Sequence, residues 1–420
     1  MSAVPAVLQY ALLPGGEDRM PGTAHDLEAA PGEEQEVTKI ELFFDLIYVF
    51  AISQLSEHLL ENLTWRGMLE TLVMSLTVFG VWTTTTYESI MALARRRTAR
   101  YLLLGVMVLG LIMNASITRA FEHSPWMFVA PLLAIQIGRP LLMRRSDASP
   151  AMRLRRVKMV VWALVSAVPW VVGALVDEHS RLPWWAAAAA IDLLGMQLWH
   201  PVLRPPAPGT PASGRGETDR DGIDLPHQLE RCQLFLIICL GEAILTTGSA
   251  IIRGLDKPVV VAAGVASLLV IICIWALFFG PASEEEGIMT PVAADPRGDN
   301  PAPIVVLATF GQQVLVLGMV AFAVGAEVVV SAPTATVEPA AVAALFDGVI
   351  ICVTAYWYFL VRSTGRRMWV SLAVCDAVLV GAAVVSAFVG LPGIAVMGLL
   401  VVVTVCTAWG FNREARRPAR

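Results

Sequence analysis

Acidic residues inside apolar segments are the features of this sequence that most suggest chemistry. Glu41 and Asp45 are four residues apart, so a helix would place both on one face. Glu242 follows Gly241 near the middle of a second apolar segment, and Glu327 lies in a third, where we expect it to be nearly as deep. A charge inside a membrane costs several kcal/mol and needs a compensating partner, ion or proton.

The pair formed by Glu41 and Asp45 also predicts a partner. Two carboxylates at this spacing repel each other, which favours a shared proton, a bound cation or a basic neighbour from another helix. His227, Glu230 and Arg231 occupy one side of the first turns of a later helix, at positions i, i+3 and i+4. We therefore predict that these residues, with Glu242 and Glu327, line a polar path or a ligand-binding site.

Other polar residues have simpler interpretations. Gly241 is expected to let another backbone approach closely. The single acids and amides within apolar helices could be buried hydrogen-bond partners, and His58, His123 and His179 are expected to be solvated near helix ends. These acids and amides are Asp192, Asp347, Asp376, Gln312 and Gln313. No spacing of His, Cys, Asp or Glu predicts a metal site, and no cofactor motif is found.

The composition excludes a water-soluble globular protein. Apolar residues make up 56% of the chain and charged residues only 15%, and the apolar residues come in runs long enough to cross a bilayer as helices. We predict an all-α polytopic membrane protein with about twelve transmembrane helices. The predicted spans are 40–60, 67–87, 101–120, 125–143, 157–176, 183–203, 228–250, 258–280, 302–330, 338–360, 368–389 and 393–411.

The distribution of Lys and Arg predicts the orientation. With the N-terminus in the cytoplasm, 24 of the 30 basic residues fall in cytoplasmic segments and five on the opposite side. This asymmetry follows the positive-inside rule and predicts a multi-pass protein of the bacterial inner membrane with both termini in the cytoplasm. Residues 1–38 are expected to be a disordered tail, 39–203 and 227–411 two six-helix halves, 204–226 a cytoplasmic linker and 412–420 a basic tail.

The two halves suggest an internal duplication. Lys39, Leu42 and Phe43 align with Arg231, Leu234 and Phe235, and a distal Ala-Ile recurs at the same spacing. Because each half has an even number of predicted helices, the copies would be parallel repeats.

Three motifs are similar to those of the bacterial low temperature requirement A (LtrA) family. They are Glu41-Leu-Phe-Phe-Asp45-Leu-Ile-Tyr-Val-Phe-Ala-Ile52, the segment from His227 through Glu230 and Arg231 to Glu242, and Ala323-Val-Gly325-x-Glu327. The resemblance covers residues 38–333 and implies a membrane protein without stating its biochemical activity. It also implies a His in the ninth helix, where this chain has Gln312.

The first of these helices also resembles the opening helix of potassium channels built from six-helix repeats. Lys39, Phe43 and Asp45 match the Arg, Phe and Asp of that signature, while Phe44 replaces its Ser. In the second half Arg231 and Phe235 are kept and Ile237 replaces the acid. Both resemblances agree with a plan of six plus six helices.

Three functions follow as hypotheses. The leading one is a channel or transporter for an ion or a proton. The alternatives are an intramembrane enzyme acting on a lipid or isoprenoid, with Glu41, Asp45, His227 and Glu242 as acid–base candidates, and a structural or stress-related membrane protein. Membrane lipids and a small ion or small-molecule substrate are the expected partners, a homodimer is left open, and neither a nucleic acid nor a cofactor is expected.

Overall fold

Apolar helices make up nearly all of the described part of the chain. The computed structural model describes residues 38–93, 97–142, 150–199, 225–279, 302–364 and 369–415, which lie in a compact unit beginning at Val37. The predicted N-terminal tail through residue 37 and the linker residues 204–224 lie outside the described residues. Outside its regular helices, the described part of the chain includes an isolated β-bridge between Thr336 and Pro392.

Proline and polar residues mark many of the helix starts. Pro125, Pro150, Pro258 and Pro339 are each the first residue of a helix, where the missing N–H costs nothing. The helices are α1 (Lys39–Glu61), α2 (Trp65–Leu93), α3 (Arg97–Ala115), α4 (Ile117–Ala120), α5 (Pro125–Leu142), α6 (Pro150–Leu175), α7 (Glu178–Trp199), α8 (Leu225–Ile252), α9 (Pro258–Phe279), α11 (Ala302–Ser331), α12 (Pro339–Thr364), α13 (Trp369–Val389) and α14 (Gly393–Ala415).

The helices have the length and composition of membrane spans. Among the described residues, nine are long and apolar enough to cross a bilayer: α2, α5, α6, α8, α9, α11, α12, α13 and α14. A tenth, α3, is apolar over a shorter stretch, Arg100–Ala115. Large apolar side chains such as Phe388 (88% exposed) and Val370 (78% exposed) cover the outer surfaces, as expected for a protein whose solvent there is lipid.

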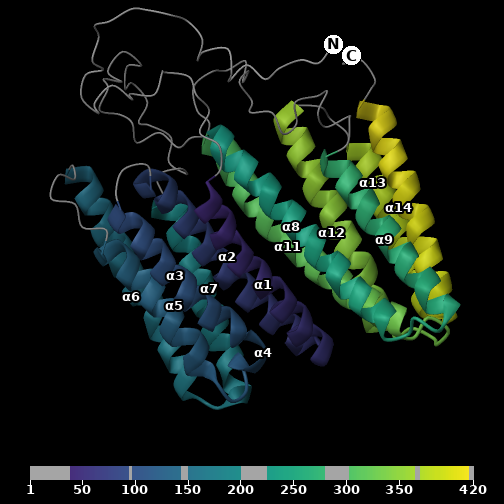
Figure 1. Cartoon of the computed structure of the whole chain (residues 1–420), viewed down its shortest axis with the longest axis horizontal. Helices are drawn as coiled ribbons and strands as arrows, with labels where there is room; N and C mark the ends of the chain where they lie inside the picture. Colours follow the sequence, from purple (N-terminus) through teal and green to yellow (C-terminus); the bar gives the residue numbers. More distant parts are fainter. Residues whose placement is uncertain are drawn as a thin grey trace, which may run out of the picture. The chain divides into compact units, whose positions relative to one another are not determined.

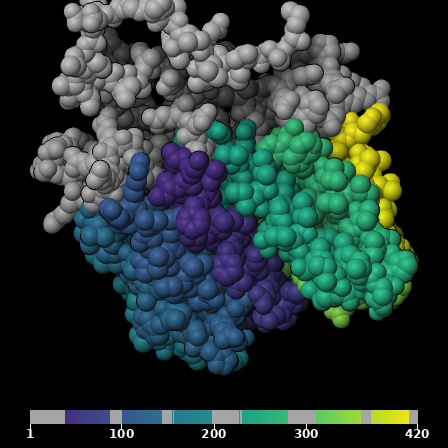
Figure 2. Space-filling model, in the orientation of Figure 1, coloured from purple at the N-terminus to yellow at the C-terminus, as the bar shows by residue number. Residues whose placement is uncertain are grey.

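Two groups of helices meet along α1, α8 and α11. In Figure 1, α2 to α7 lie on one side and α9, α12, α13 and α14 on the other, with α1, α8 and α11 between them. The apolar core follows the same division, since one buried cluster is built mainly from residues before 190 and the other from residues after 235. Figure 2 shows α1 between the two groups on this face. The contacts between the two groups and the ion-pair network described below lie along this seam.

Some predicted boundaries differ from the structure. The span predicted at 101–120 is interrupted, because α3 ends at Ala115 and the short α4 follows. Ser116 explains the break, since its hydroxyl donates to the carbonyl of Met113 at 2.7 Å in competition with helical bonding. Likewise, α8 begins at Leu225, within the predicted linker, and α14 extends to Ala415, within the predicted C-terminal tail.

Helices α11 and α12 pack closely against each other. A Cβ added at Gly325 would lie 2.5 Å from the backbone nitrogen of Leu345, and one added at Gly348 would lie 2.4 Å from that of Phe322. Only residues without a side chain allow this approach, as is common at helix contacts in membranes.

Candidate functional site

A buried ion pair joins the two helix groups at the seam. Arg231 of α8 donates from Nε to Asp45 Oδ2 at 3.0 Å and from Nη2 to Asp45 Oδ1 at 2.8 Å. Both side chains are 0% exposed. Two parallel hydrogen bonds of this kind give both strength and a fixed orientation. The sequence predicted that a shared proton, a bound cation or a basic neighbour from another helix compensates the carboxylates of α1. The structure shows the basic neighbour.

Glu41 extends this network toward the start of α1. One carboxylate oxygen lies 3.3 Å from His227 Nε2 and 3.5 Å from Arg231 Nη1. The other accepts hydrogen bonds from the backbone N–H of Thr38 at 2.9 Å and from its hydroxyl at 2.7 Å, which closes a capping box. Glu41 therefore both starts α1 and ties it to α8.

Aromatic side chains enclose the guanidinium of Arg231. Its central carbon lies 5.4 Å from the ring centre of Phe44 and 6.0 Å from that of Trp82, within the range of a cation–π contact. The indole N–H of Trp82 also donates to Asp45 Oδ1 at 2.7 Å. The Asp45 carboxylate thus accepts three hydrogen bonds, and the pair of Asp45 and Arg231 is closed to water.

The register of α1 against α8 shows that the two helices run parallel. His227 contacts Glu41 and Arg231 contacts Asp45, and further along the hydroxyl of Ser53 donates to Glu242 Oε1 at 2.5 Å. Glu242 is 17 residues beyond the start of α8, or about 25 Å at 1.5 Å per residue, and it is half-buried. The ionisable side chains therefore follow one seam from the helix starts to Glu242.

Several polar atoms beside this seam lack a partner. The Tyr48 hydroxyl, Asn114 Oδ1 and Gln312 Nε2 are buried, and each has no hydrogen-bond partner among the described residues. Asn114 still donates from Nδ2 to the carbonyl of Ile47 at 2.8 Å. Buried polar atoms without partners are costly unless water reaches them. Water between the helices near α1 would satisfy these three groups.

The remaining predicted site residues lie apart from the network. Glu230 is exposed, although it shares the first turns of α8 with His227 and Arg231. Glu327 is four residues from the end of α11, where its carboxylate pairs with Arg253 at 2.6 Å. Glu327 therefore lies nearer to the end of its helix than Glu242 does, whereas the sequence predicted a similar depth for both. The expected close approach at Gly241 is wrong, because an added Cβ would meet nothing within 4 Å.

One histidine prediction is also wrong. His58 is 1% exposed rather than solvated, and its Nε2 lies 3.3 Å from Glu70. Arg66 Nε donates to the same carboxylate at 2.7 Å. His123 and His179 are exposed, as expected, with 83% and 79% of their side chains accessible. Burial of His58 follows from packing against α2, which the sequence of α1 alone does not reveal.

The charge balance of the network suggests what it can do. Two carboxylates, Glu41 and Asp45, face one permanently charged guanidinium. A proton on His227 would supply the second positive charge, so the network can exchange a proton without breaking the Asp45–Arg231 pair. No group of three or more His, Cys, Asp or Glu side chains arranged to hold a metal ion is found in the described parts of the chain.

Trp82 and Ser53 belong to this candidate site by their contacts, and the sequence did not predict either of them. Trp82 opens the run Trp-Thr-Thr-Thr-Thr in α2, whose polar content within an apolar helix was the available signal. Ser53 is a small hydroxyl on the same helix as Asp45 and gave no signal of its own.

Comparison with known proteins was consistent with these motifs. The profile of the family described as "Bacterial low temperature requirement A protein (LtrA)" matches residues 36–408. An uncharacterized protein of Rhizobium meliloti (strain 1021) is 29% identical over 310 residues, which cover 72% of this chain and 71% of the relative. No solved structure matches the chain.

Proposed function

The chain belongs to the bacterial low temperature requirement A (LtrA) family of membrane proteins, and from this premise we propose that it moves a proton or a small ion along the seam between α1 and α8. The supporting observation is the line of ionisable side chains on two parallel helices. It runs from Glu41 and His227 through Asp45 and Arg231 to Glu242.

The depth of Glu242 favours transport over a purely structural role. A carboxylate about 25 Å along its helix and bonded to one hydroxyl has far less compensation than Asp45, which accepts three hydrogen bonds. Such a group is retained at a cost and usually marks an ion or proton pathway. The unpartnered atoms of Tyr48 and Gln312 favour water nearby.

A proton fits the seam better than a metal cation. Arg231 places a permanent positive charge beside the first half of the path, and this charge repels a cation that must pass it. Protons can instead move between His227, Glu41 and water by exchange of hydrogen bonds, without a wide pore. The resemblance to potassium channels therefore supports the helix arrangement more than the ion selectivity.

The membrane arrangement belongs to the same proposal. With α1, α3 and α7 added to the nine apolar helices, the chain crosses the bacterial inner membrane twelve times and has both termini in the cytoplasm. The Glu41–His227 end of the seam then faces the cytoplasm, and the pair of Arg253 and Glu327 faces outward. The two halves are related as parallel six-helix repeats, consistent with the matched Lys39 and Arg231 helices.

Flux measured in reconstituted vesicles tests the proposal. Wild-type protein should dissipate an imposed pH gradient, and Glu242→Gln, which keeps the shape and the Ser53 bond, should reduce the initial rate at least tenfold. Glu230→Gln is the matched control, because it makes the same change on an exposed position of the same helix and should leave the rate unchanged.

Two outcomes would contradict the proposal. Wild-type vesicles that show neither proton nor monovalent-cation flux under any gradient would favour the enzyme hypothesis. Unchanged flux in a well-folded Glu242→Gln protein would remove the seam from the pathway.

A further inference from the structure

The two helix groups join through unlike faces. Helix α1 packs against α8 and α11, and α2 packs against α11. Within the groups the helices pack in the same order, since α1 contacts α2 and α3 while α8 contacts α9 and α11. On the parallel six-helix repeat proposed above, α8, α9 and α11 are the counterparts of α1, α2 and α3. The first half thus joins through α1 and α2, whereas the second half joins through the counterparts of α1 and α3.

A contact between unlike faces leaves one face of each kind outside the join. The second half repeats the α1 and α2 surface on α8 and α9, and the first half repeats the α8 and α11 surface on α1 and α3. Contacts of this heterologous type continue from unit to unit until they close into a ring. If one chain closed the ring by itself, both of these remaining faces would be buried.

An aromatic contact at the join identifies side chains that should then be covered. The ring centre of Phe235 on α8 lies 4.8 Å from that of Trp82 and 5.9 Å from that of Phe79, both on α2. All three side chains are 0% exposed. The sequence alignment of α1 with α8 pairs Phe235 with Phe43, which is 55% exposed. The first half therefore presents on its surface the ring that the second half buries.

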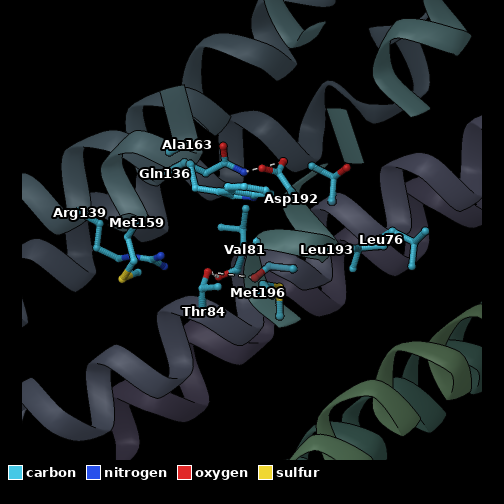
Figure 3. A pocket seen from close by; sticks show the side chains of 14 residues that line it. Leu76, Val81, Thr84, Gln136, Arg139, Met159, Ala163, Asp192, Leu193 and Met196 are labelled. Atoms are coloured by element: carbon cyan, nitrogen blue, oxygen red, sulfur yellow. Dashed lines mark hydrogen bonds between the residues drawn. The ribbon is translucent and has the colours of Figure 1, made fainter. Parts of the chain in front are cut away.

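Helix α9 carries the counterparts of the two rings on α2. Trp82 aligns without gaps with Trp275, and Phe79 then aligns with Ile272. The same alignment pairs positions that are buried in both helices: Val78 with Ile271, and Val81 with Ile274. Figure 3 shows Val81 lining a cavity between α2, α5, α6 and α7, so this position faces the inside of its own half. Trp275 and Ile272, in contrast, are 46% and 47% exposed.

The remaining counterparts show the same difference. Asp45 and Ser53 of α1 contact α8, and their counterparts on α8, Ile237 and Leu245, are exposed. On α11 a stripe of side chains is buried against the first half, and α3 has an exposed stripe of the same spacing. The stripe on α11 is Gln313, Val316, Val320 and Val324, and that on α3 is Tyr101, Leu104, Val108 and Ile112.

Exposure alone does not identify what covers these faces, because lipid also suits apolar side chains. The correspondence does identify it, since each exposed position repeats one that the other half buries at the join. The α8–α9 face contains Ile237, Leu245, Ile272 and Trp275, and the α1–α3 face contains Phe43 and the stripe on α3. These two faces complement each other as the joined faces do, and a second copy of the chain carries both.

We infer, on the basis of the six-helix repeat proposed above, that two copies of this chain form a closed dimer, with the α8–α9 face of each copy against the α1–α3 face of the other. Phe43 of one copy packs against Trp275 and Ile272 of the other, as Phe235 packs against Trp82 and Phe79 within the chain. Two chains supply four halves and leave no face of either kind open. Because Ile237 is the counterpart of Asp45, the contact between copies is apolar where the join within the chain holds an ion pair.

Cross-linking between differently tagged copies in liposomes tests these faces. The full-length chain with its six native cysteines replaced carries Phe43→Cys in one copy and Trp275→Cys in the other. A short bismaleimide should produce a covalent product that contains both tags. Val374→Cys in place of Trp275→Cys is the matched control, because Val374 is 56% exposed and lies five residues from the start of α13, at nearly the depth of Trp275 on the proposed topology. It should give no such product.

Native mass spectrometry of the unmodified chain released from nanodiscs measures the same assembly without cysteine substitutions, and it should find two chains per particle. Trp275→Ala should raise the dissociation constant of the dimer by at least about tenfold, as for a buried tryptophan at an interface. Trp126→Ala, the same change at a tryptophan of equal exposure on α5, should leave the constant unchanged.

Four results would overturn the inference. They are single chains at every protein-to-lipid ratio, equal cross-linking in the control pair, particles of more than two chains, and an unchanged dissociation constant in Trp275→Ala. Assembly is measured without a gradient, so its failure would leave proton movement along the seam standing. A dimer linked through Phe43 and Trp275 that moves no ion would contradict only the transport proposal.

Discussion

The pair of Asp45 and Arg231 should behave as a coupled unit in a double-mutant cycle. Both side chains are fully buried and share two hydrogen bonds, and removal of one partner from a buried ion pair typically costs 3–5 kcal/mol. Glu41 lies 3.5 Å from the guanidinium and retains part of the compensation in Asp45→Asn. We therefore expect a loss of about 3 kcal/mol in the free energy of unfolding, at the lower end of that range.

Arg231→Gln should cost more, about 4 kcal/mol, because it leaves two carboxylates without the guanidinium. The double variant should lose at least about 1.5 kcal/mol less than the sum of the single losses, since it leaves neither Asp45 nor Arg231 charged. Unfolding by sodium dodecyl sulfate in mixed micelles, followed by tryptophan fluorescence, measures these free energies. Glu230→Gln, an exposed change one residue before Arg231, is the control.

Two results would refute this reasoning. One is a loss below about 1 kcal/mol in either single variant, which is the range of an exposed pair. The other is additivity of the two changes within about 0.5 kcal/mol, the behaviour of independent sites.

The remaining predictions concern packing and the outer ends of the helices. Gly325→Ala should lower the melting temperature strongly because its Cβ would collide with the backbone of α12, whereas Gly241→Ala should change it little. Arg181→Gln should cost about 1.5–3 kcal/mol in chemical unfolding, because its guanidinium donates to backbone carbonyls near the α4–α5 turn and the end of α6 and is only 4% exposed. Arg253→Gln should cost no more than about 1 kcal/mol in the same assay, because the pair with Glu327 is partly exposed.

Residues on one helix were easier to place from sequence than contacts between helices. The spacing of Glu41 and Asp45 predicted a shared face and a compensating group, and the structure has both. Local spacing could not identify Arg231 as that group, because a contact between residues 186 positions apart depends on how α1 and α8 pack. Burial of His58 and the open space beside Gly241 were missed for the same reason.

The membrane class followed directly from hydropathy, since apolar runs of this length have few other uses. Helix ends were less certain, as the break at Ser116 shows, because a single hydroxyl can compete for a backbone carbonyl.

Accessibility of Ser53 tests the central claim most directly, because its hydroxyl contacts Glu242 at the deepest point of the proposed path. Ser53→Cys, in protein whose six native cysteines are replaced, should react with a small membrane-impermeant thiol reagent in vesicles. Ile52→Cys, the adjacent position in the apolar core, should not react. Equal protection of both cysteines under every imposed gradient would contradict a water-accessible path along α1 and α8.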